Sequence, residues 1–275
     1  MEIQPEIPCE NCGTTLKPDF QFCPKCGQEN SGTPLTIKAL LKDLIGEFFS
    51  LDSKFLRSIK PLLIKPGFLT IEFFSGKRAK YISPLKLYLN ISLVYFLVLS
   101  FGKTPEMKVS FKHNEPNVTQ SDTTGIENKN TWRINPDFIE KKFKKIDKNL
   151  FWEKFNSFLS PMVFFLLPAF ALILMLLFYK SAKSYVRHFV LSLHFHSFVF
   201  TVFTFYVLIN RLIHLKYFLP ALFIIVFWNL LMCLKKIYNQ KWIVAVFKFF
   251  TLMGIYTLVF VIFLSLTFII TVLVV

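Results

Sequence analysis

The chain has 275 residues, of which 53% are apolar, and phenylalanine alone accounts for 35 of them. This composition argues against an ordinary soluble domain and indicates a membrane protein. The net charge of +15 would suit nucleic acid, but the basic residues are spread over both predicted membrane faces. Contact with membrane phospholipid therefore explains the charge better, and nucleic acid is not favoured as a partner.

Two Cys-x-x-Cys-Gly knuckles lie near the N-terminus and contain Cys9, Cys12, Cys23 and Cys26. Two such pairs predict a tetrahedral four-thiolate site for one structural Zn²⁺ per chain, with no open position for a substrate. We therefore expect residues 1–32 to form a zinc ribbon, with 14–22 as its connecting hairpin. A unit of about 20 residues buries little core, so metal binding must supply its folding energy. Iron in the same cage and two disulfides are the alternatives.

Residues 33–84 are predicted to form amphipathic juxtamembrane helices. Apolar residues recur at helical spacing over 35–49 and 51–64, opposite charged side chains, and a third apolar run covers 68–74. Pro66 followed by glycine separates the last two. These helices are too short and too charged to cross a bilayer, so we expect them at the cytoplasmic membrane surface or beneath the bundle.

A glycine and three cations precede the first predicted membrane helix, in the sequence Gly76-Lys77-Arg78-Ala79-Lys80-Tyr81. Basic residues beside a span attract anionic headgroups by about 1 kcal/mol each, so a simple membrane anchor would explain them. A second interpretation is a lipid or anion site formed by Lys77, Arg78, Lys80 and Tyr81. In that site Arg78 would be a bidentate donor that Tyr81 orients.

Several motifs occur in a fixed order: CxxCG and CPxCGQ knuckles, an LTIKALLKD-like helix, a KPG turn, and GKRxxYxxPxxxY at the start of the first span. In this order the chain resembles a family of functionally uncharacterised bacterial multipass membrane proteins. The resemblance extends from Cys9 to about Leu99, and the remainder matches only in being hydrophobic. It implies a bacterial inner-membrane protein with a cytoplasmic ribbon, and it supplies no activity.

Five apolar segments are predicted to span the bilayer, which takes about 20 helical residues. They are 85–101, 158–179, 188–210, 218–234 and 249–275, the first being short. The second carries Pro161 and Pro168, which predict a kink or an unwound start. The expected fold is an all-α integral membrane protein with about five transmembrane helices, a small N-terminal zinc ribbon and amphipathic surface helices. Residues 102–157 form the expected extracytoplasmic segment, and 158–275 a four-helix bundle.

Lysine and arginine in short loops are retained on the cytoplasmic side. The predicted turns 180–187 and 235–248 contain three and four basic residues, whereas 211–217 contains two. With five spans this bias places the N-terminus inside and the C-terminus outside. The ribbon would then lie in the reducing cytoplasm, where free thiols are available to a metal.

All 17 Asp and Glu residues lie at or before Glu153, so the four C-terminal spans contain no carboxylate. This argues against a carboxylate-driven pump or an aspartyl intramembrane protease. The polar candidates within the spans are Asn90, His188, His194, His196, Asn210 and Asn229. On a helix His194 and His196 point about 200° apart, so they cannot chelate one ion together. We expect hydrogen-bonded packing groups here, with a pore or metal role as the alternative.

The sequence contains no GxSxG, HExxH, Walker or dinucleotide-binding signature. We therefore expect a non-enzymatic inner-membrane protein whose ribbon docks a cytoplasmic partner protein or a second copy of the chain. One alternative is a transporter or channel for a small or lipidic solute. The other is a phospholipid-headgroup binder or enzyme at the cluster 77–81.

Overall fold

A computed structural model describes residues 7–17, 19–30, 36–38, 40–41, 53–101, 148–213 and 219–275. Most of the described residues are helical, and the only paired strands among them lie near the N-terminus. Most of the first predicted amphipathic helix, over 35–49, lies outside the described residues, as does the segment 102–147.

The N-terminal unit, which we call the ribbon (residues 7–30), consists of two small hairpins. β1 (Ile7–Pro8) pairs antiparallel with β2 (Thr15–Leu16), and Phe22 forms an isolated bridge with Glu29. The prediction of a hairpin over 14–22 is wrong. Each Cys-x-x-Cys-Gly knuckle itself reverses the chain, so the strands pair on either side of a knuckle and not between the two knuckles.

Among the described residues, five apolar helices follow the juxtamembrane region: α4 (Pro84–Ser100), α6 (Lys148–Phe178), α7 (Tyr185–Ile213), α8 (Leu219–Ile237) and α9 (Trp242–Val274). The last four are long and apolar enough to cross a membrane. α4 has only 17 residues, which gives about 25 Å of helix against a hydrocarbon core of about 30 Å.

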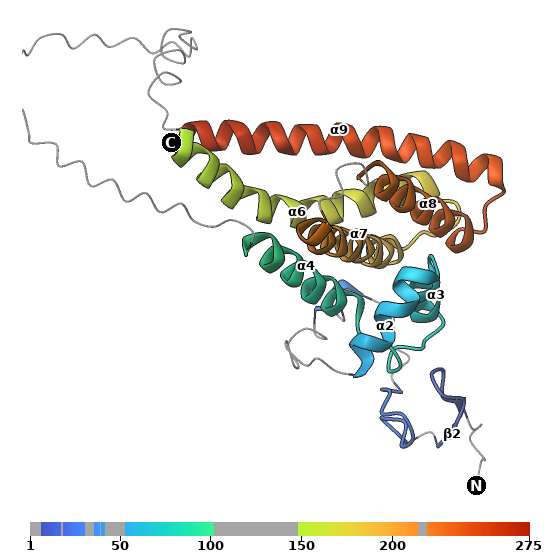
Figure 1. Cartoon of the computed structure of the whole chain (residues 1–275). Helices are drawn as coiled ribbons and strands as arrows, with labels where there is room; N and C mark the ends of the chain where they lie inside the picture. The colour runs from blue at the N-terminus through green and yellow to red at the C-terminus, as the bar shows by residue number, and fades with distance from the viewer. Residues whose placement is uncertain are drawn as a thin grey trace, which may run out of the picture.

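Two helices begin well before their predicted starts at residues 158 and 249. α6 begins at Lys148 and α9 at Trp242, so both extend through lysine-containing sequence. A long aliphatic side chain explains the second case, because Lys248 Nζ lies 4.3 Å from the ring centroid of Phe178 and its stem covers apolar surface. α6 remains one helix through both prolines and bends along its course (Figure 1).

α7 is the central helix and contacts α2 (Ser53–Ile64), α3 (Phe68–Phe74), α4, α6 and α8. α2 and α3 therefore lie beneath the bundle, with Leu62 and Leu69 buried in the main core. Between them Gly67 adopts a φ of 76°, and a Cβ there would lie 3.3 Å from Ile237 on α8. Glycine thus permits both the turn and its close packing.

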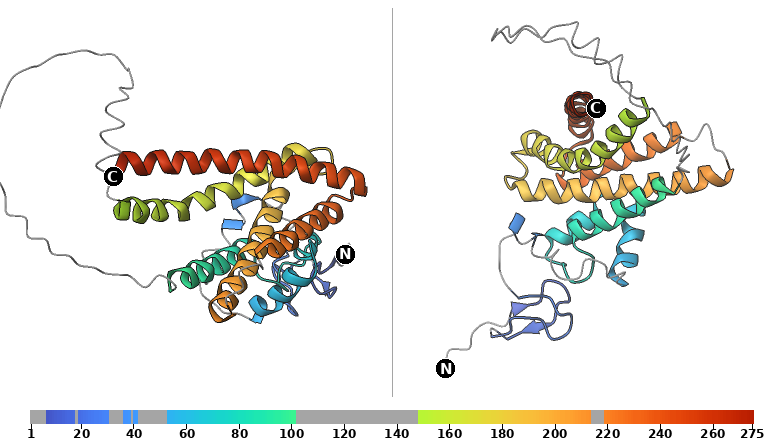
Figure 2. Two further views of the ribbon diagram at one scale, coloured as in Figure 1. Left: turned by 45° about the horizontal axis from the view of Figure 1, so that its top comes forward. Right: turned by 90° about the vertical axis from the view of Figure 1, so that its left-hand side faces the viewer.

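The apolar helices alternate in direction. At one end of the bundle the α6–α7 turn meets the α8–α9 turn, where Gln240 donates a hydrogen bond to Ser181 over 3.1 Å. At the other end Phe151 packs on Phe268, with 5.4 Å between ring centroids. The ribbon lies below α2 and α3, near the first end (Figure 1). α9 lies on the face of the bundle opposite the ribbon (Figure 2).

Candidate metal centre and the adjoining basic loop

The four knuckle cysteines converge on one point. Their Sγ atoms all lie within 4.8 Å of one another, with 3.6 Å between Cys9 and Cys26 and 3.5 Å between Cys12 and Cys23. A tetrahedral zinc site with Zn–S bonds of about 2.3 Å needs sulfur atoms about 3.8 Å apart, so the cluster could hold a metal ion. The distances are too long for disulfide bonds of about 2.05 Å. They suit zinc and iron equally.

Both knuckles use the same backbone geometry. The N–H group of Gly13 donates to the carbonyl of Cys9, and that of Gly27 to the carbonyl of Cys23, each over 2.8 Å. The two glycines have φ values of 73° and 70°, a conformation that side chains with a Cβ rarely adopt. The glycine after each second cysteine is therefore required by the turn.

The hydroxyl group of Thr14 favours the thiolate form of one ligand, Cys12. The Thr14 hydroxyl lies 3.3 Å from Sγ of Cys12. This hydrogen bond is the largest of several, from Thr14, Cys23 and Cys26, that together lower the pKa of the Cys12 thiol to about 6. Thiolates are the form that binds metal, so this ligand is available at neutral pH. Four sulfur donors without an open position are typical of a structural site.

Gln28 joins the ribbon to residues 76–82, which we call the basic loop. Its Nε2 donates to the carbonyl of Gly76 over 2.7 Å, and its Oε1 accepts from the N–H groups of Arg78 and Ala79 over 3.1 and 3.2 Å. One side chain thus pairs with three backbone groups of the loop. Glu10 packs beside Gly76, where an added Cβ would lie 2.1 Å from its Oε2.

α2 fixes the other end of the basic loop. The N–H group of Ile82 donates to Oγ of Ser58 over 3.1 Å, and that hydroxyl donates to the carbonyl of Lys54 over 2.7 Å. The Tyr81 ring packs edge-on against Phe68, with 6.0 Å between centroids. The loop backbone is therefore held between the ribbon and α2.

The cations of the basic loop have different surroundings. Lys77 Nζ lies 2.8 Å from Oε1 of Glu72, in an ion pair that remains partly exposed. The Arg78 guanidinium lies 5.5 Å from the ring centroid of Phe73. Stacking on the ring covers one face of the guanidinium and leaves its N–H groups free to bind in their own plane.

A small cavity of about 10 Å³ opens beside these side chains. Its lining consists of Leu69, Phe73, Lys77, Arg78, Tyr81, Ile82 and His194. Three of the four predicted anion-binding residues thus border one cavity. Lys80 does not, and its ammonium lies 5.5 Å from the ring centroid of Tyr81.

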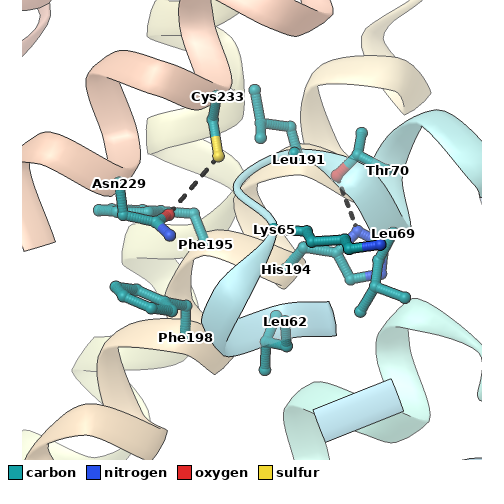
Figure 3. A pocket seen from close by; sticks show the side chains of 11 residues that line it. Leu62, Lys65, Leu69, Thr70, Leu191, His194, Phe195, Phe198, Asn229 and Cys233 are labelled. Atoms are coloured by element: carbon teal, nitrogen blue, oxygen red, sulfur yellow. Dashed lines mark hydrogen bonds between the residues drawn. The ribbon is translucent and has the colours of Figure 1, made fainter. Parts of the chain in front are cut away.

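A second cavity of about 20 Å³ lies between the α2–α3 turn, α7 and α8 (Figure 3). Its polar lining comes from Lys65, Thr70, His194, Asn229 and Cys233. The Cys233 thiol donates to Oδ1 of Asn229 over 3.5 Å. This volume suffices for about one water molecule. Leu69 and His194 line both cavities.

His188 is buried at the end of the bundle near the ribbon, and both of its ring nitrogens have partners. Nε2 lies 3.0 Å from the carbonyl of Ala182, to which it donates, and Nδ1 lies 2.7 Å from the hydroxyl of Tyr238. The histidine thus ties the α6–α7 turn to the residue after α8. Asn210 lies half-buried near the opposite end of α7.

His194 and His196 face different helices. His196 Nδ1 donates to the carbonyl of Ser192 over 2.8 Å, and its Nε2 lies 3.0 Å from the hydroxyl of Tyr256 on α9. His194 Nδ1 lies 2.9 Å from the hydroxyl of Thr70 on α3. The structure does not bring the two rings to one ligand.

Three residues that position the basic loop and its neighbour were absent from the predicted site: Gln28, Ser58 and Thr70. Gln28 directly follows the second knuckle, and a neutral amide there can both donate and accept. Ser58 and Thr70 are hydroxyl residues on otherwise apolar helix faces, and both are buried. A buried hydroxyl needs a partner, which is the signal that could have singled them out.

The basic loop lies within a segment that is similar to a family of unknown function. The model of the family described as "Protein of unknown function (DUF3667)" matches residues 52–96. This range covers α2, α3, the basic loop and most of α4, and it excludes the ribbon and α6 to α9. No curated protein and no solved structure matches the chain. The similarity therefore concerns the segment that the ribbon contacts.

Proposed function

We propose that the protein is a multipass inner-membrane protein of bacteria whose zinc ribbon is a structural docking module for the basic loop of its own chain. The pairing of Gln28 with Gly76, Arg78 and Ala79 carries this proposal. In this view one structural Zn²⁺ folds the ribbon, and the ribbon fixes the backbone that presents Lys77 and Arg78. Phospholipids surround the bundle. Exposed Phe22 on the ribbon suits a cytoplasmic protein partner or a second copy.

Replacing Gln28 by alanine tests the docking. The substitution removes three hydrogen bonds, each worth about 1 kcal/mol. The Arg78 N–H group keeps a second acceptor in the carbonyl of Gly76, over 2.9 Å, so we expect the amide of Ala79 above all to exchange with solvent about tenfold faster or more. Hydrogen exchange measured by mass spectrometry on the intact protein in nanodiscs reports this directly. Asn30→Ala is the matched control, because its amide donates within the ribbon, to the carbonyl of Phe20 over 3.1 Å. Unchanged exchange in Gln28→Ala would contradict the docking.

The location of the charges supports a cytoplasmic ribbon. Basic residues of the described chain gather at the ribbon end of the bundle, on α2, in the basic loop and around the turns that connect α6 to α7 and α8 to α9. Fewer lie at the opposite end, where α6 begins with Lys148 and Lys154 and where Arg211 donates to the carbonyl of Val98. Positive charge is retained on the cytoplasmic side of short loops.

Fusion of topology reporters provides the test of this orientation. A reporter that is active only outside the cytoplasm should be active when fused after Val275 and inactive when fused before Met1. The reason is that five alternating helices put the two ends on opposite sides. Activity at the C-terminus would be lost if α4, with its 17 residues, fails to cross. That result would leave four spans and both ends on one side.

Binding of an anionic group by the basic loop is a second candidate function. The cavity lined by Lys77, Arg78 and Tyr81 favours it, because three polar side chains from one loop converge there. An enzymatic role for the loop has no comparable support. In this function the ribbon would serve the site by holding the loop in place.

A further inference from the structure

His194 differs from the other two histidines of α7 in its hydrogen bonding. His188 and His196 each use both ring nitrogens. His194 is only 6% exposed, yet Thr70 is its one hydrogen-bond partner in the part of the chain that the structure describes. Its Nε2 has no partner among the described residues and is not one of the fully buried polar atoms, so it keeps access to the cavities that His194 lines and is available to a ligand.

The contact with Thr70 fixes which nitrogen of His194 carries the proton. Thr70 is 1% exposed, and among the described residues its hydroxyl has only Nδ1 as a partner, at 2.9 Å. The hydroxyl proton therefore has its acceptor at Nδ1, because the alternative leaves that proton buried without one. With Nδ1 accepting, Nε2 bears the ring proton and is a hydrogen-bond donor.

The small cavity places His194 beside the basic loop. Lys77, Arg78 and Tyr81 line the same space, and its lining contains no carboxylate among the described residues. Glu72, which pairs with Lys77, offsets one of the two positive charges. The remaining groups are the guanidinium of Arg78, the hydroxyl of Tyr81 and the Nε2–H of His194, all of which can donate hydrogen bonds. This set of donors selects an anion.

We infer that His194 is the interior ligand of a phosphate-binding site whose outer ligands are Arg78 and Lys77. The inference rests on the proposed binding of an anion by the basic loop. A cavity of about 10 Å³ admits one oxygen atom, which would meet Nε2 of His194. The other oxygens stay at the mouth, where Arg78 can bind two of them in the plane of its guanidinium.

Phosphate can reach this site from a lipid headgroup or from solution. The basic loop ends at the start of α4, the first apolar helix, so its height along the bundle suits a headgroup. Its partly exposed lysine also leaves it open to a free ion. The same donors would bind either source, so the experiment must separate them.

The full-length protein in phosphatidylcholine nanodiscs would be titrated with inorganic phosphate and followed by phosphorus NMR. Parallel nanodiscs that also contain phosphatidic acid or phosphatidylglycerol would be analysed by native mass spectrometry for retained lipid. Binding of inorganic phosphate assigns the free ion, and retention of phosphatidic acid alone assigns the headgroup. Either result supports the inference if it depends on His194.

Two substitutions of His194 separate its nitrogens. The amide of glutamine reaches the position of Nε2, whereas that of asparagine reaches only the position of Nδ1. We expect His194→Asn to weaken phosphate or phosphatidic acid binding about tenfold, and His194→Gln to stay within about threefold of the parent protein. Arg78→Ala should weaken binding at least as much as His194→Asn. Arg187→Ala is the matched control, because this guanidinium stacks on Phe74 at 5.1 Å and does not line the cavity.

Thr70 provides a second test if the His194 variants fold poorly. Thr70→Val removes the hydroxyl that donates to Nδ1 and should weaken binding, while Thr70→Ser should preserve it. If Arg78→Ala abolishes binding but the His194 and Thr70 variants bind like the parent, the inference about His194 is wrong and the anion-binding loop stands. If the parent protein binds neither phosphate nor phosphatidic acid, both proposals are wrong.

Discussion

Replacing Cys12 by serine is expected to lower the bound zinc from about one ion per chain to nearly none. Binding of the metal by four thiolates supplies most of the folding free energy of such a small unit, about 10–16 kcal/mol in zinc-finger peptides. Without the metal the ribbon should unfold, and Gln28 can then no longer hold the basic loop. Elemental analysis of the purified protein measures the metal, and faster exchange of the Arg78 and Ala79 amides reports release of the loop.

Cys233→Ser is the matched control for this experiment. It makes the same chemical change at the fifth cysteine, which is buried on α8 and is not part of the four-sulfur cluster. Zinc content should remain at the parent level in this variant, and both variants should remain in the membrane fraction. If elemental analysis finds iron and not zinc in the parent protein, the site is assigned to iron. Metal retained in Cys12→Ser would refute the four-thiolate site, and loss of membrane insertion in that variant would refute a purely structural ribbon.

Gly76→Ala should produce the second large effect, because two costs add at this position. Its φ of 81° is unfavourable for alanine, and the new Cβ would lie 2.1 Å from Oε2 and 2.8 Å from Cβ of Glu10. Backbone strain of about 1 kcal/mol and overpacking of about 1–3 kcal/mol should together separate the ribbon from the loop. We expect the Arg78 and Ala79 amides to exchange at least about 30-fold faster, which corresponds to about 2 kcal/mol.

A second substitution separates the two costs. Glu10→Ala removes the carboxylate that the new Cβ would contact. The double variant Glu10→Ala/Gly76→Ala should therefore recover part of the protection of the loop amides against exchange, while the backbone strain remains. Gly254→Ala is the control for replacing a glycine, because nothing lies within 4 Å of the added atom and its backbone is helical. The predicted contact between Glu10 and Gly76 is wrong if Gly76→Ala exchanges like the parent protein.

Local sequence patterns predicted those parts of the fold that depend on interactions between residues close together in the chain. The convergence of Cys9 and Cys26 follows from two short turns within one small unit. The helices over 53–64 and 68–74 follow from apolar periodicity and from the break at Gly67. The apolar runs predicted α6 to α9, but their lysine-containing ends did not show that α9 begins at Trp242, since the stem of a lysine can pack on a ring.

Contacts between distant segments could not be read from periodicity or spacing. Gln28 and the backbone of Ala79 are joined across the sequence through main-chain groups that every residue possesses, so no residue type marks the contact. The difference between His194 and His196 depends on which helix each one faces. Thr70, the partner that sets His194 apart, belongs to a short apolar run in which its hydroxyl looked incidental.

The apolar helices differ widely in length. α4 and α8 have 17 and 19 residues, whereas α6 and α9 have 31 and 33. At 1.5 Å per residue these correspond to about 25 and 28 Å against about 46 and 50 Å. A bilayer around this bundle would therefore contact short helices on some sides and long helices on others. Hydrophobic mismatch would thin the bilayer beside the short helices α4 and α8. Since α4 starts just after the basic loop, local thinning would draw headgroups toward Arg78, and their binding would depend on bilayer thickness.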